Sequence, residues 1–227
     1  IAPNGAYIKV DDTAKALLRL SGYYRSKFDI PVIGLTGSVG KTTTKEFTHL
    51  VVSAKYNAIK TLGNLNNEIG VPQMLFQIDN STEAAVIEMG MNHFGEISRL
   101  VNEVKPTIGL ITNIGVSHIE NLGSREGILK AKLELCEGLA EGAPLILNGD
   151  NHMLQTVKDE HHKVVFYGTA TGEYKAANIV EADNSTSFDV AYYGKKQHIT
   201  IPTIGIHNVY NALAAFLRAL GDSKSPL

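Results

Sequence analysis

The sequence predicts a P-loop-containing α/β fold, with a mostly parallel sheet, helices on both faces and a small antiparallel sheet at one end. Three observations lead to this prediction. Short apolar runs alternate with helical patterns up to about residue 167, as in parallel sheets buried on both faces. Residues 31–44 join an apolar run to a helix through a glycine turn, which is the context of a phosphate-binding loop. Three short, turn-separated and partly alternating segments then follow between residues 174 and 201.

Composition limits the class of protein. With 227 residues, 44% of them hydrophobic, the chain can hold one large domain or two small ones. The formal net charge of −2 gives no electrostatic reason to expect nucleic acid as a partner. The single cysteine, Cys136, excludes an internal disulfide and suits a reducing cytosol. No apolar run approaches the roughly 20 residues of a membrane helix, and residues at the start of this sequence lack the basic-then-apolar pattern of a signal peptide. We therefore expect a cytoplasmic protein without a membrane partner, cut from a longer chain because residue 1 is Ile.

The N-terminal part resembles the end of a preceding structure. Residues 1–12 contain a possible strand end at 7–10, and residues 13–28 have the pattern of an amphipathic helix. We expect Leu17, Leu20 and Tyr24 to face the core. The basic residues on the opposite face are Lys15, Arg19 and Lys27.

The glycine turn at residues 31–44 is the centre of the prediction. Gly37 and Gly40 allow the backbone to approach a phosphate and to take positive φ, and the following helix, to about residue 54, adds its positive end. Lys41 can reach β- and γ-phosphates, and the Thr42 hydroxyl can bind Mg²⁺. Leu35 stands where the common loop has its first glycine. The alternative is a glycine turn capped by threonines.

The remaining elements follow in order. Helices are expected from near residue 72, at 94–104, from the cap Ser124 to about 139, at 153–160 and at 207–220. The apolar stripe of the 124–139 helix consists of Ile128, Leu129, Leu133, Cys136 and Leu139. Parallel strands are expected at 56–61, 84–88, 108–113, 145–148 and 164–167, with loops at 63–70 and 114–123. Antiparallel strands are expected at 174–182, 187–193 and 197–201, and residues 222–227 read as a linker.

Several polar residues follow the predicted strands. Glu88 ends a strand at the edge where ligands bind in parallel sheets, so it could hold Mg²⁺ or simply cap a helix. His118 lies in a loop after the next strand and could face the same crevice or satisfy a local hydrogen bond. Lys132, like Lys130, would normally be a solvated helix lysine. Asn208 and Asn211 are three residues apart on one helix face, where they could bind adenine or cap the helix.

Taken together, these motifs resemble the Mur ligases, the ATP-dependent amino-acid-adding enzymes of peptidoglycan synthesis. The matching motifs, in order, are TGSVGKTT at 36–43, the strand ending in Glu88, TNIGVSH at 112–118, the lysine helix and GIHNVYN at 205–211. The resemblance covers nearly the whole chain from about residue 10. Within the family, GNLNNEIGVP at 63–72, EMGMNH at 88–93 and HIENLGS at 118–124 are most similar to the branch that adds D-alanyl-D-alanine.

The resemblance implies a fold, a reaction and a set of site residues. Residues 1–28 would be the end of an N-terminal substrate domain and a linker helix, residues 29–222 the central ATP-binding domain, and 223–227 the start of a linker to a further domain. The substrates would be ATP, a UDP-N-acetylmuramoyl tripeptide and D-alanyl-D-alanine. Two Mg²⁺ ions would bind to Thr42, Glu88, His118 and a carbamylated Lys132. ATP would contact Gly37, Ser38, Val39, Gly40, Lys41, Thr42, Thr43, Asn208 and Asn211, and Asn67 would lie near the reacting groups.

Other interpretations stay open at this point. Folylpolyglutamate synthetase and other ligases share this ATPase core, although the asparagine-rich loop at 64–67 argues against them by resemblance. A nucleotide switch would need an Asn-Lys-x-Asp motif and an Asp-x-x-Gly strand end, and neither occurs. The chain could also be a fragment that binds nucleotide without turnover.

Overall fold

The fold is organised around one twisted sheet. The computed structural model describes residues 7–192 and 194–220. Within these residues nine strands are arranged in the order β2-β3-β1-β4-β5-β6-β7-β8-β9. Their bounds are β1 Val32–Thr36, β2 Ala58–Lys60, β3 Ala84–Glu88, β4 Ile108–Ile111, β5 Pro144–Asn148, β6 Lys163–Gly168, β7 Tyr174–Ala182, β8 Ser185–Tyr192 and β9 Lys195–Ile201. Neighbours from β2 to β7 pair in parallel, whereas β7–β8 and β8–β9 are antiparallel. The predicted fold class is confirmed.

The register of the central strands positions the candidate site. β1 lies between β3 and β4, and Leu35 is the register partner of both Glu88 and Leu110. The three strands therefore end at nearly the same height. The segments that follow β1, β3 and β4 start from one edge of the sheet, where ligands bind in open parallel sheets.

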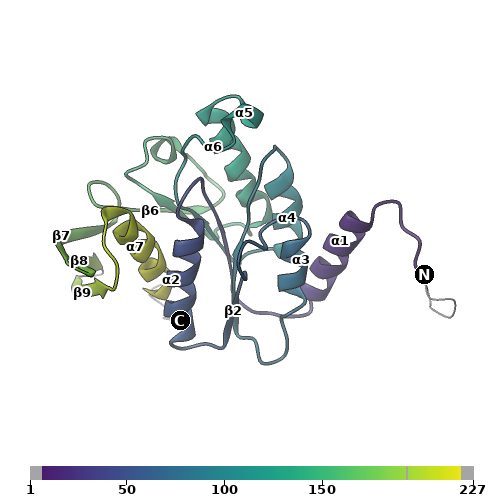
Figure 1. Cartoon of the computed structure of the whole chain (residues 1–227), viewed down its shortest axis with the longest axis horizontal. Coiled ribbons are helices and arrows are strands. Elements are labelled where there is room, and N and C mark those ends of the chain that lie inside the picture. The colour runs from purple at the N-terminus through teal and green to yellow at the C-terminus, as the bar shows by residue number, and fades with distance from the viewer. Residues whose placement is uncertain (1–6, 193, 221–227) are drawn as a thin grey trace.

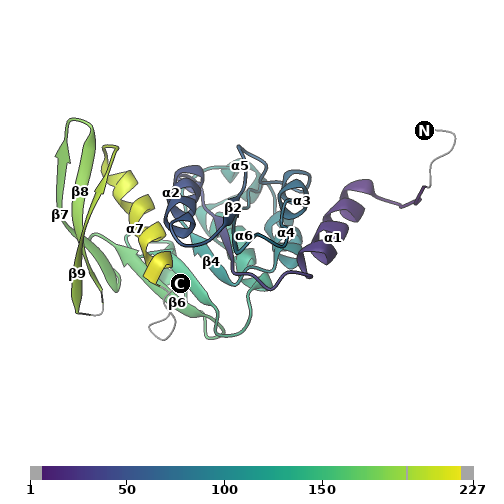
Figure 2. The ribbon, with the colours of Figure 1, turned by 90° about the horizontal axis from the view of Figure 1, so that it is seen from below.

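Helices cover both faces of the sheet. On one face lie α1 Thr13–Arg25, α3 Gly70–Leu75, α4 Glu96–Val104 and α6 Arg125–Leu133, and on the other lie α2 Lys41–Ser53 and α7 Ile206–Leu220. Figure 1 and Figure 2 show α2 beside α7, with α3 and α4 across the sheet from them. Alternate strand residues feed two separate cores, for example Val32 into the first and Ile33 into the second. Each fully buried aliphatic side chain contributes about 1.5–3 kcal/mol.

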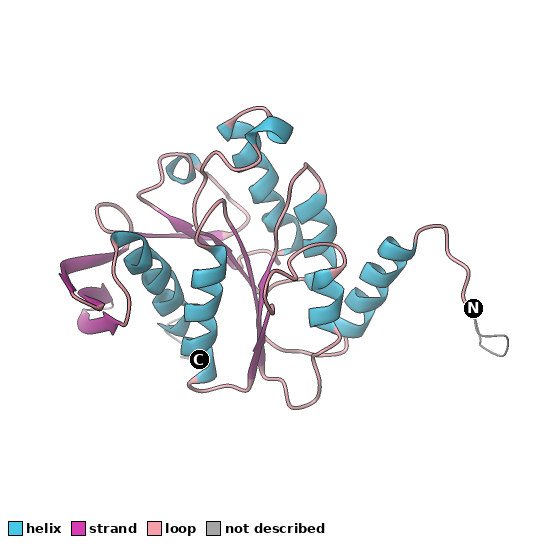
Figure 3. Ribbon diagram, in the orientation of Figure 1, coloured by secondary structure: helices cyan, strands magenta, loops and turns pink. Residues whose placement is uncertain are grey.

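The antiparallel strands lie at one end of the molecule, and α1 lies at the other (Figure 3). β8 contributes Phe188 and Val190 to the core under α7, so the antiparallel part shares a core with the parallel sheet. The strand predicted at 187–193 ends at Tyr192, and its last predicted residue lies outside the described part. The linker predicted at 222–227 lies outside it as well. Among the described residues, no helix is long and apolar enough to cross a membrane.

Two predictions at the N-terminus are wrong. Residues 7–10 form no strand, and α1 ends at Arg25 instead of 28. The buried face of α1 carries Leu18 and the polar or small residues Ser21, Gly22 and Arg25, whereas Leu20 is 57% exposed. The Arg25 guanidinium donates to the carbonyl oxygens of residues 104, 28 and 30, which explains how a charged side chain is buried there.

Two predictions around β5 also need correction. The helix begins after the predicted cap Ser124, which accepts from the Gly127 N–H, but α6 ends at Leu133. A 3₁₀ helix, η1 Glu134–Gly138, replaces its predicted last part. The helix predicted at 153–160 is absent, and only the 3₁₀ turn η2 Leu154–Thr156 forms. The physical reason is Asp159, whose carboxylate accepts the backbone N–H groups of His161 and His162 and so favours a turn. The loop predicted at 114–123 contains one short turn of helix, α5 Ile119–Leu122.

Candidate active site

The glycine loop, residues 37–40, connects β1 to α2 at the carboxyl edge of the sheet. Gly40 has φ +80° and precedes the first residue of α2, a conformation that costs glycine little. A Cβ at Gly37 would lie 1.9 Å from Thr112 Oγ1, so the loop packs closely on Thr112, the residue directly after β4. The first N–H groups of α2, from residues 41–43, have no partner within the helix, which leaves donors for an anion.

The segment after β4 fixes the glycine loop. The Ser38 N–H donates to the Asn113 carbonyl (3.0 Å), and the Val39 N–H donates to Asn113 Oδ1 (3.0 Å). Thr112 Oγ1 in turn donates to the Val39 carbonyl (2.8 Å), and the Gly115 N–H donates to Ser38 Oγ (2.9 Å). These bonds use the N–H groups of Ser38 and Val39 within the protein. These two N–H groups are therefore not free for a phosphate, and the predicted contacts of residues 37–43 with ATP stay a prediction.

Lys41 lies over the glycine loop. Its Nζ donates to the Gly37 carbonyl at 2.9 Å. Burial lowers the pKa of Lys41, and the nearby negative charge of Glu88 opposes that change. The amine is thus held where a phosphate would replace the carbonyl as its partner.

Glu88 is the polar centre of the site. The residue is 1% exposed, and its backbone N–H donates to Thr61 Oγ1 at 2.9 Å. Its Oε2 accepts from Thr42 Oγ1 at 3.4 Å, and its Oε1 accepts from Asn66 Nδ2 at 2.8 Å. The structure therefore brings together the predicted residues Thr42 and Glu88. A hydroxyl and a carboxylate are oxygen ligands of the kind Mg²⁺ prefers.

Two neighbours of Glu88 were not predicted. Lys45 is 1% exposed, with its Nζ 3.7 Å from Glu88 Oε2 and 3.2 Å from the Gly63 carbonyl. The second is Asn66, whose Nδ2 donates to Glu88 Oε1. Burial of a lysine cannot be inferred from an apolar pattern. The only signal in the sequence was position, since Lys45 lies one helical turn after Lys41.

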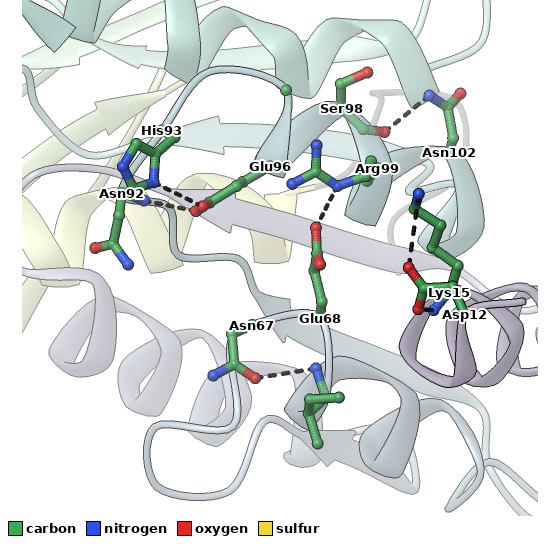
Figure 4. Close-up of polar contacts among 12 residues, drawn as sticks. Asp12, Lys15, Asn67, Glu68, Asn92, His93, Glu96, Ser98, Arg99 and Asn102 are labelled. Carbon is green, nitrogen blue, oxygen red and sulfur yellow. Dashed lines mark hydrogen bonds and ion pairs between the residues drawn. The ribbon is translucent and has the colours of Figure 1, made fainter. Parts of the chain in front are cut away.

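The loop at residues 63–70 is held by polar contacts of its own side chains, and Figure 4 shows those of Asn67 and Glu68. Asn67 Oδ1 accepts from the N–H groups of Ile69 (3.1 Å) and Gly70 (2.9 Å), so Asn67 caps the start of α3. Glu68 forms an ion pair with Arg99 of α4. The predicted substrate-side role of Asn67 has no counterpart in its present contacts and stays a prediction.

Lys132 lies on α6 and is 2% exposed, unlike the exposed Lys130 two residues earlier. Among the described residues its amine has no hydrogen bond or ion pair. Burial, with the positive charge of Lys41 as a smaller cause, lowers the pKa of Lys132 to about 7. Lys132 is therefore a buried lysine and not a solvated one.

His118 lies after β4 with φ +64°, directly before α5. The ring is partly buried, and in the part of the chain that the structure describes it has no hydrogen bond or ion pair. The structure thus leaves the ring without a local partner, and a metal role for it stays a prediction.

The two asparagines of α7 lie against the start of α2. Asn211 Oδ1 accepts from Thr44 Oγ1 at 3.0 Å and lies 2.8 Å from where a Cβ on Gly40 would be. Asn208 Nδ2 donates to Thr203 Oγ1 (3.0 Å) and to the Ile204 carbonyl (2.8 Å). Asn211 is therefore brought to the glycine loop, and Asn208 lies beside Asn211, whose Nδ2 is 3.4 Å from Asn208 Oδ1; both amides already have protein partners.

Asp150 ties the turn after β6 to α7. Its carboxylate accepts from the N–H groups of residues 169–171 and from the hydroxyls of Thr169, Thr171 and Tyr210. Partial burial alone would raise the pKa of Asp150, but these hydrogen bonds outweigh it and hold the pKa below its ordinary value. This network fixes α7, and with it Asn208 and Asn211, relative to the sheet.

The comparisons with known proteins agree with this geometry. Residues 35–219 match the Mur ligase middle domain family, so the chain belongs to that family. Among curated proteins it is similar to the UDP-N-acetylmuramoyl-tripeptide--D-alanyl-D-alanine ligase of Bacillus subtilis, with 44% identity over 93% of this chain and 46% of that protein. The enzyme of the same name from Escherichia coli is 37% identical over 91% of this chain and 46% of that protein. The chain thus spans about half the length of the curated relatives it matches.

Solved structures agree as well. A crystal structure of MurF from Acinetobacter baumannii has a TM-score of 0.91 and 34% identity, covering 97% of this chain and 49% of that one. MurF ligase from Thermotoga maritima in complex with ADP has a TM-score of 0.87 and 26% identity, covering 95% and 51%.

Proposed function

We propose that the chain is the ATP-binding domain of an ATP-dependent ligase that adds D-alanyl-D-alanine to a UDP-N-acetylmuramoyl tripeptide. Residues 29–222 would form that domain, with α1 as the linker from a preceding one. The observation that carries the proposal is the Thr42–Glu88 pair beside Lys41 at one edge of the sheet, with Lys132 buried close enough to Lys41 for their charges to interact. The identity to curated ligases of this name supports the choice of substrates.

The proposed reaction has two steps. The terminal carboxylate of the tripeptide attacks the γ-phosphorus of ATP, and ADP leaves, so a poor electrophile becomes an acyl phosphate. The amine of D-alanyl-D-alanine then attacks the acyl carbon through a tetrahedral intermediate, and phosphate leaves. Because ATP and a reduced Cys136 both suit the cytoplasm, we assign the enzyme to that compartment.

The contacts of the residues present fit one Mg²⁺ ion, and a second ion is part of the proposal. Thr42 and Glu88 offer oxygen ligands for one ion, and His118 with Lys132 would serve the second. When bound, the ions would neutralise phosphate charge in the transition state. Lys45 and Asn66 hold the Glu88 carboxylate in one orientation, so little rearrangement is needed before catalysis.

Lys132 fits carbamylation. A pKa of about 7 leaves a large fraction of the amine neutral at neutral pH, and only a neutral amine reacts with CO₂. The reaction forms an N–C bond and releases one proton. The product is a carbamate, so an anionic oxygen ligand replaces the ammonium cation. If Lys132 stayed an ammonium group, its positive charge would repel both Lys41 and the bound cations.

Lys41 and the first turn of α2 would hold the phosphates. The amine that now donates to the Gly37 carbonyl can turn to the β- and γ-phosphates, and the N–H groups of residues 41–43 supply fixed donors. Asn208 and Asn211, at the start of α7, would lie toward the adenine.

The test is ligation by the complete enzyme. Phosphate release and product formation should occur with D-alanyl-D-alanine and not with L-glutamate or single D-amino acids. Lys132→Ala should abolish ligation, and added acetate should restore part of it by supplying an oxygen ligand, whereas Lys130→Ala should remain active. Full activity of Lys132→Ala without acetate would remove the carbamate from the mechanism. Ligation with L-glutamate alone would instead favour the folylpolyglutamate synthetase class.

A further inference from the structure

A second cluster of metal-ligating side chains lies away from the candidate active site. Cys136 in η1 and Asp159 and His162 before β6 bring together a thiol, a carboxylate and an imidazole. Their ligand atoms all lie within 4.8 Å of one another. Because His162 directly precedes β6, the cluster lies at the amino ends of the parallel strands, opposite the edge that carries Glu88. It therefore has no part in the proposed reaction.

The three side chains converge on one partly buried point. His162 Nδ1 lies 2.8 Å from Asp159 Oδ2, and the side chains of these two residues are 9% and 14% exposed. Asp159 Oδ1 accepts the N–H groups of His161 (2.9 Å) and His162 (3.1 Å), so the carboxylate is fixed by its other oxygen. Cys136 is partly buried beside the same carboxylate.

We propose that Cys136, Asp159 and His162 form a structural site for a divalent cation of the zinc class, with solvent as the fourth ligand. Sulfur, nitrogen and oxygen donors in one set suit Zn²⁺. With metal–ligand distances of about 2.0–2.3 Å, ligand atoms of a tetrahedral site are about 3.3–3.7 Å apart, so the present spacing needs only small adjustments. A thiolate and a carboxylate balance the charge of the ion, which makes a partly buried site neutral.

Binding exchanges protons for the metal. The Cys136 thiol loses its proton to solvent and forms the metal–sulfur bond. Burial, with Asp159 beside it, raises the pKa of this thiol to about 12, so the thiol stays protonated until a cation takes the place of the proton. His162 binds the metal as the neutral imidazole, with Nδ1 as the ligand atom and the ring proton on Nε2.

The position of the site suggests what the metal would do. The crossover from β5 to β6 contains only the three-residue turn η2, and its last part is held by Asp159. A metal shared with Cys136 would join this irregular crossover to η1, the segment that follows α6. The expected effect is a higher melting temperature for the chain with Zn²⁺.

Cobalt titration tests the proposal directly. Because Cys136 is the chain's single cysteine, a thiolate-to-Co²⁺ charge-transfer band can come only from this site. The 227-residue chain, kept reduced, should show this band with one equivalent of Co²⁺. Zn²⁺ should displace the Co²⁺, remove the band and release one proton from the thiol.

Two neighbouring histidines provide a matched control. His161 is 77% exposed and pairs with Glu141, whereas His162 belongs to the cluster. Outer-sphere partners alone are worth about 10–100-fold in metal affinity, so losing a ligand in His162→Ala should weaken binding at least about 100-fold. His161→Ala should change it less than about threefold.

Further variants guard against misfolding. Cys136→Ser should fold as judged by circular dichroism but lose the band, and Asp159→Asn keeps an oxygen for the turn but removes the charge. The proposal is overturned if no charge-transfer band forms, or if the band persists in His162→Ala with unchanged affinity. It is equally overturned if Zn²⁺ raises the melting temperature of Cys136→Ser as much as that of the unchanged chain.

Discussion

Replacing Lys132 by methionine should stabilise the folded domain near neutral pH, although it removes a residue of the proposed site. Lys132 is 2% exposed, and burial lowers its pKa from 10.5 to about 7. At 1.36 kcal/mol per pKa unit, holding the charged form in the folded protein costs about 4 kcal/mol at pH 7. Methionine has a similar length and no charge. Allowing for imperfect packing, we expect a gain of about 2–4 kcal/mol in the free energy of unfolding.

The sign of the pH dependence follows from linkage. Between the folded pKa of about 7 and the unfolded value of 10.5, the unfolded state binds more protons at Lys132 than the folded state does. The stability of the unchanged protein therefore rises with pH across this window. Below pH 7 the destabilising effect of burying Lys132 is fully present, and above pH 10.5 it is gone. The advantage of Lys132→Met should accordingly be largest near pH 7 and shrink toward pH 10.5.

Urea unfolding at several pH values across this window measures the effect. The buffers must be free of CO₂, because carbamylation would change the charge of Lys132. Lys130→Met, an exposed lysine on the same helix, should change stability by less than about 0.5 kcal/mol. A Lys132→Met variant that is less stable at pH 7, or a difference that does not vary with pH, would refute the reasoning.

Three further changes test other contacts. Lys41→Ala should weaken Mg²⁺–ADP binding about 10–100-fold in calorimetry, the value of a charge-assisted contact of about 1.5–3 kcal/mol, with an unchanged circular dichroism spectrum; equal affinity would exclude this lysine from the phosphate site. Lys45→Met should lower the free energy of unfolding by about 3 kcal/mol or more, because it leaves Glu88 buried without its cation. Lys60→Met, whose ion pair with Glu46 is more exposed, should lower it by less than about 1 kcal/mol, and equal losses would contradict the buried pairing. Asp150→Ala should cost about 2–4 kcal/mol through its lost hydrogen bonds. Because the pKa of Asp150 is held below 3.8, its contribution is present above that pH and lost as the pH falls below it, so thermal melts in acid should show a weaker pH dependence for the variant.

The sheet was predictable because its signal is local. The apolar run at 84–88 became β3 with both ends as predicted, and the glycine turn after β1 became the loop that starts α2. Strands buried on both faces read as continuous apolar runs, so little context is needed to find them.

The predictions of the helices at 13–28 and 153–160 were wrong because polar side chains, and not apolar ones, determine the local packing there. In α1 the apolar pattern pointed to Leu20, but Gly22 lets the helix approach Glu103 closely and Arg25 satisfies three carbonyl oxygens. At 153–160 the helical pattern was outweighed by the turn that Asp159 caps. Neither effect depends on periodicity, so a pattern of apolar residues could not reveal it.

The candidate site was only partly predictable for a similar reason. Motif positions pointed to Lys41, Thr42, Glu88 and Lys132, but the contact of Asn66 with Glu88 depends on how the loop at 63–70 turns. The second layer around Glu88, formed by Lys45 and Asn66, follows from packing between distant segments.

The contact between Asn211 and Thr44 has a consequence for synthesis on the ribosome. The two residues are 167 positions apart, and Asn211 lies against the backbone at Gly40. At about 5–20 residues per second, the asparagine is made roughly 10–30 s after the threonine. A nascent chain therefore carries a complete glycine-loop sequence for that time without the helix that supports it. The contacts of α7 with Gly40 and Thr44 can form only after this last helix has left the ribosome.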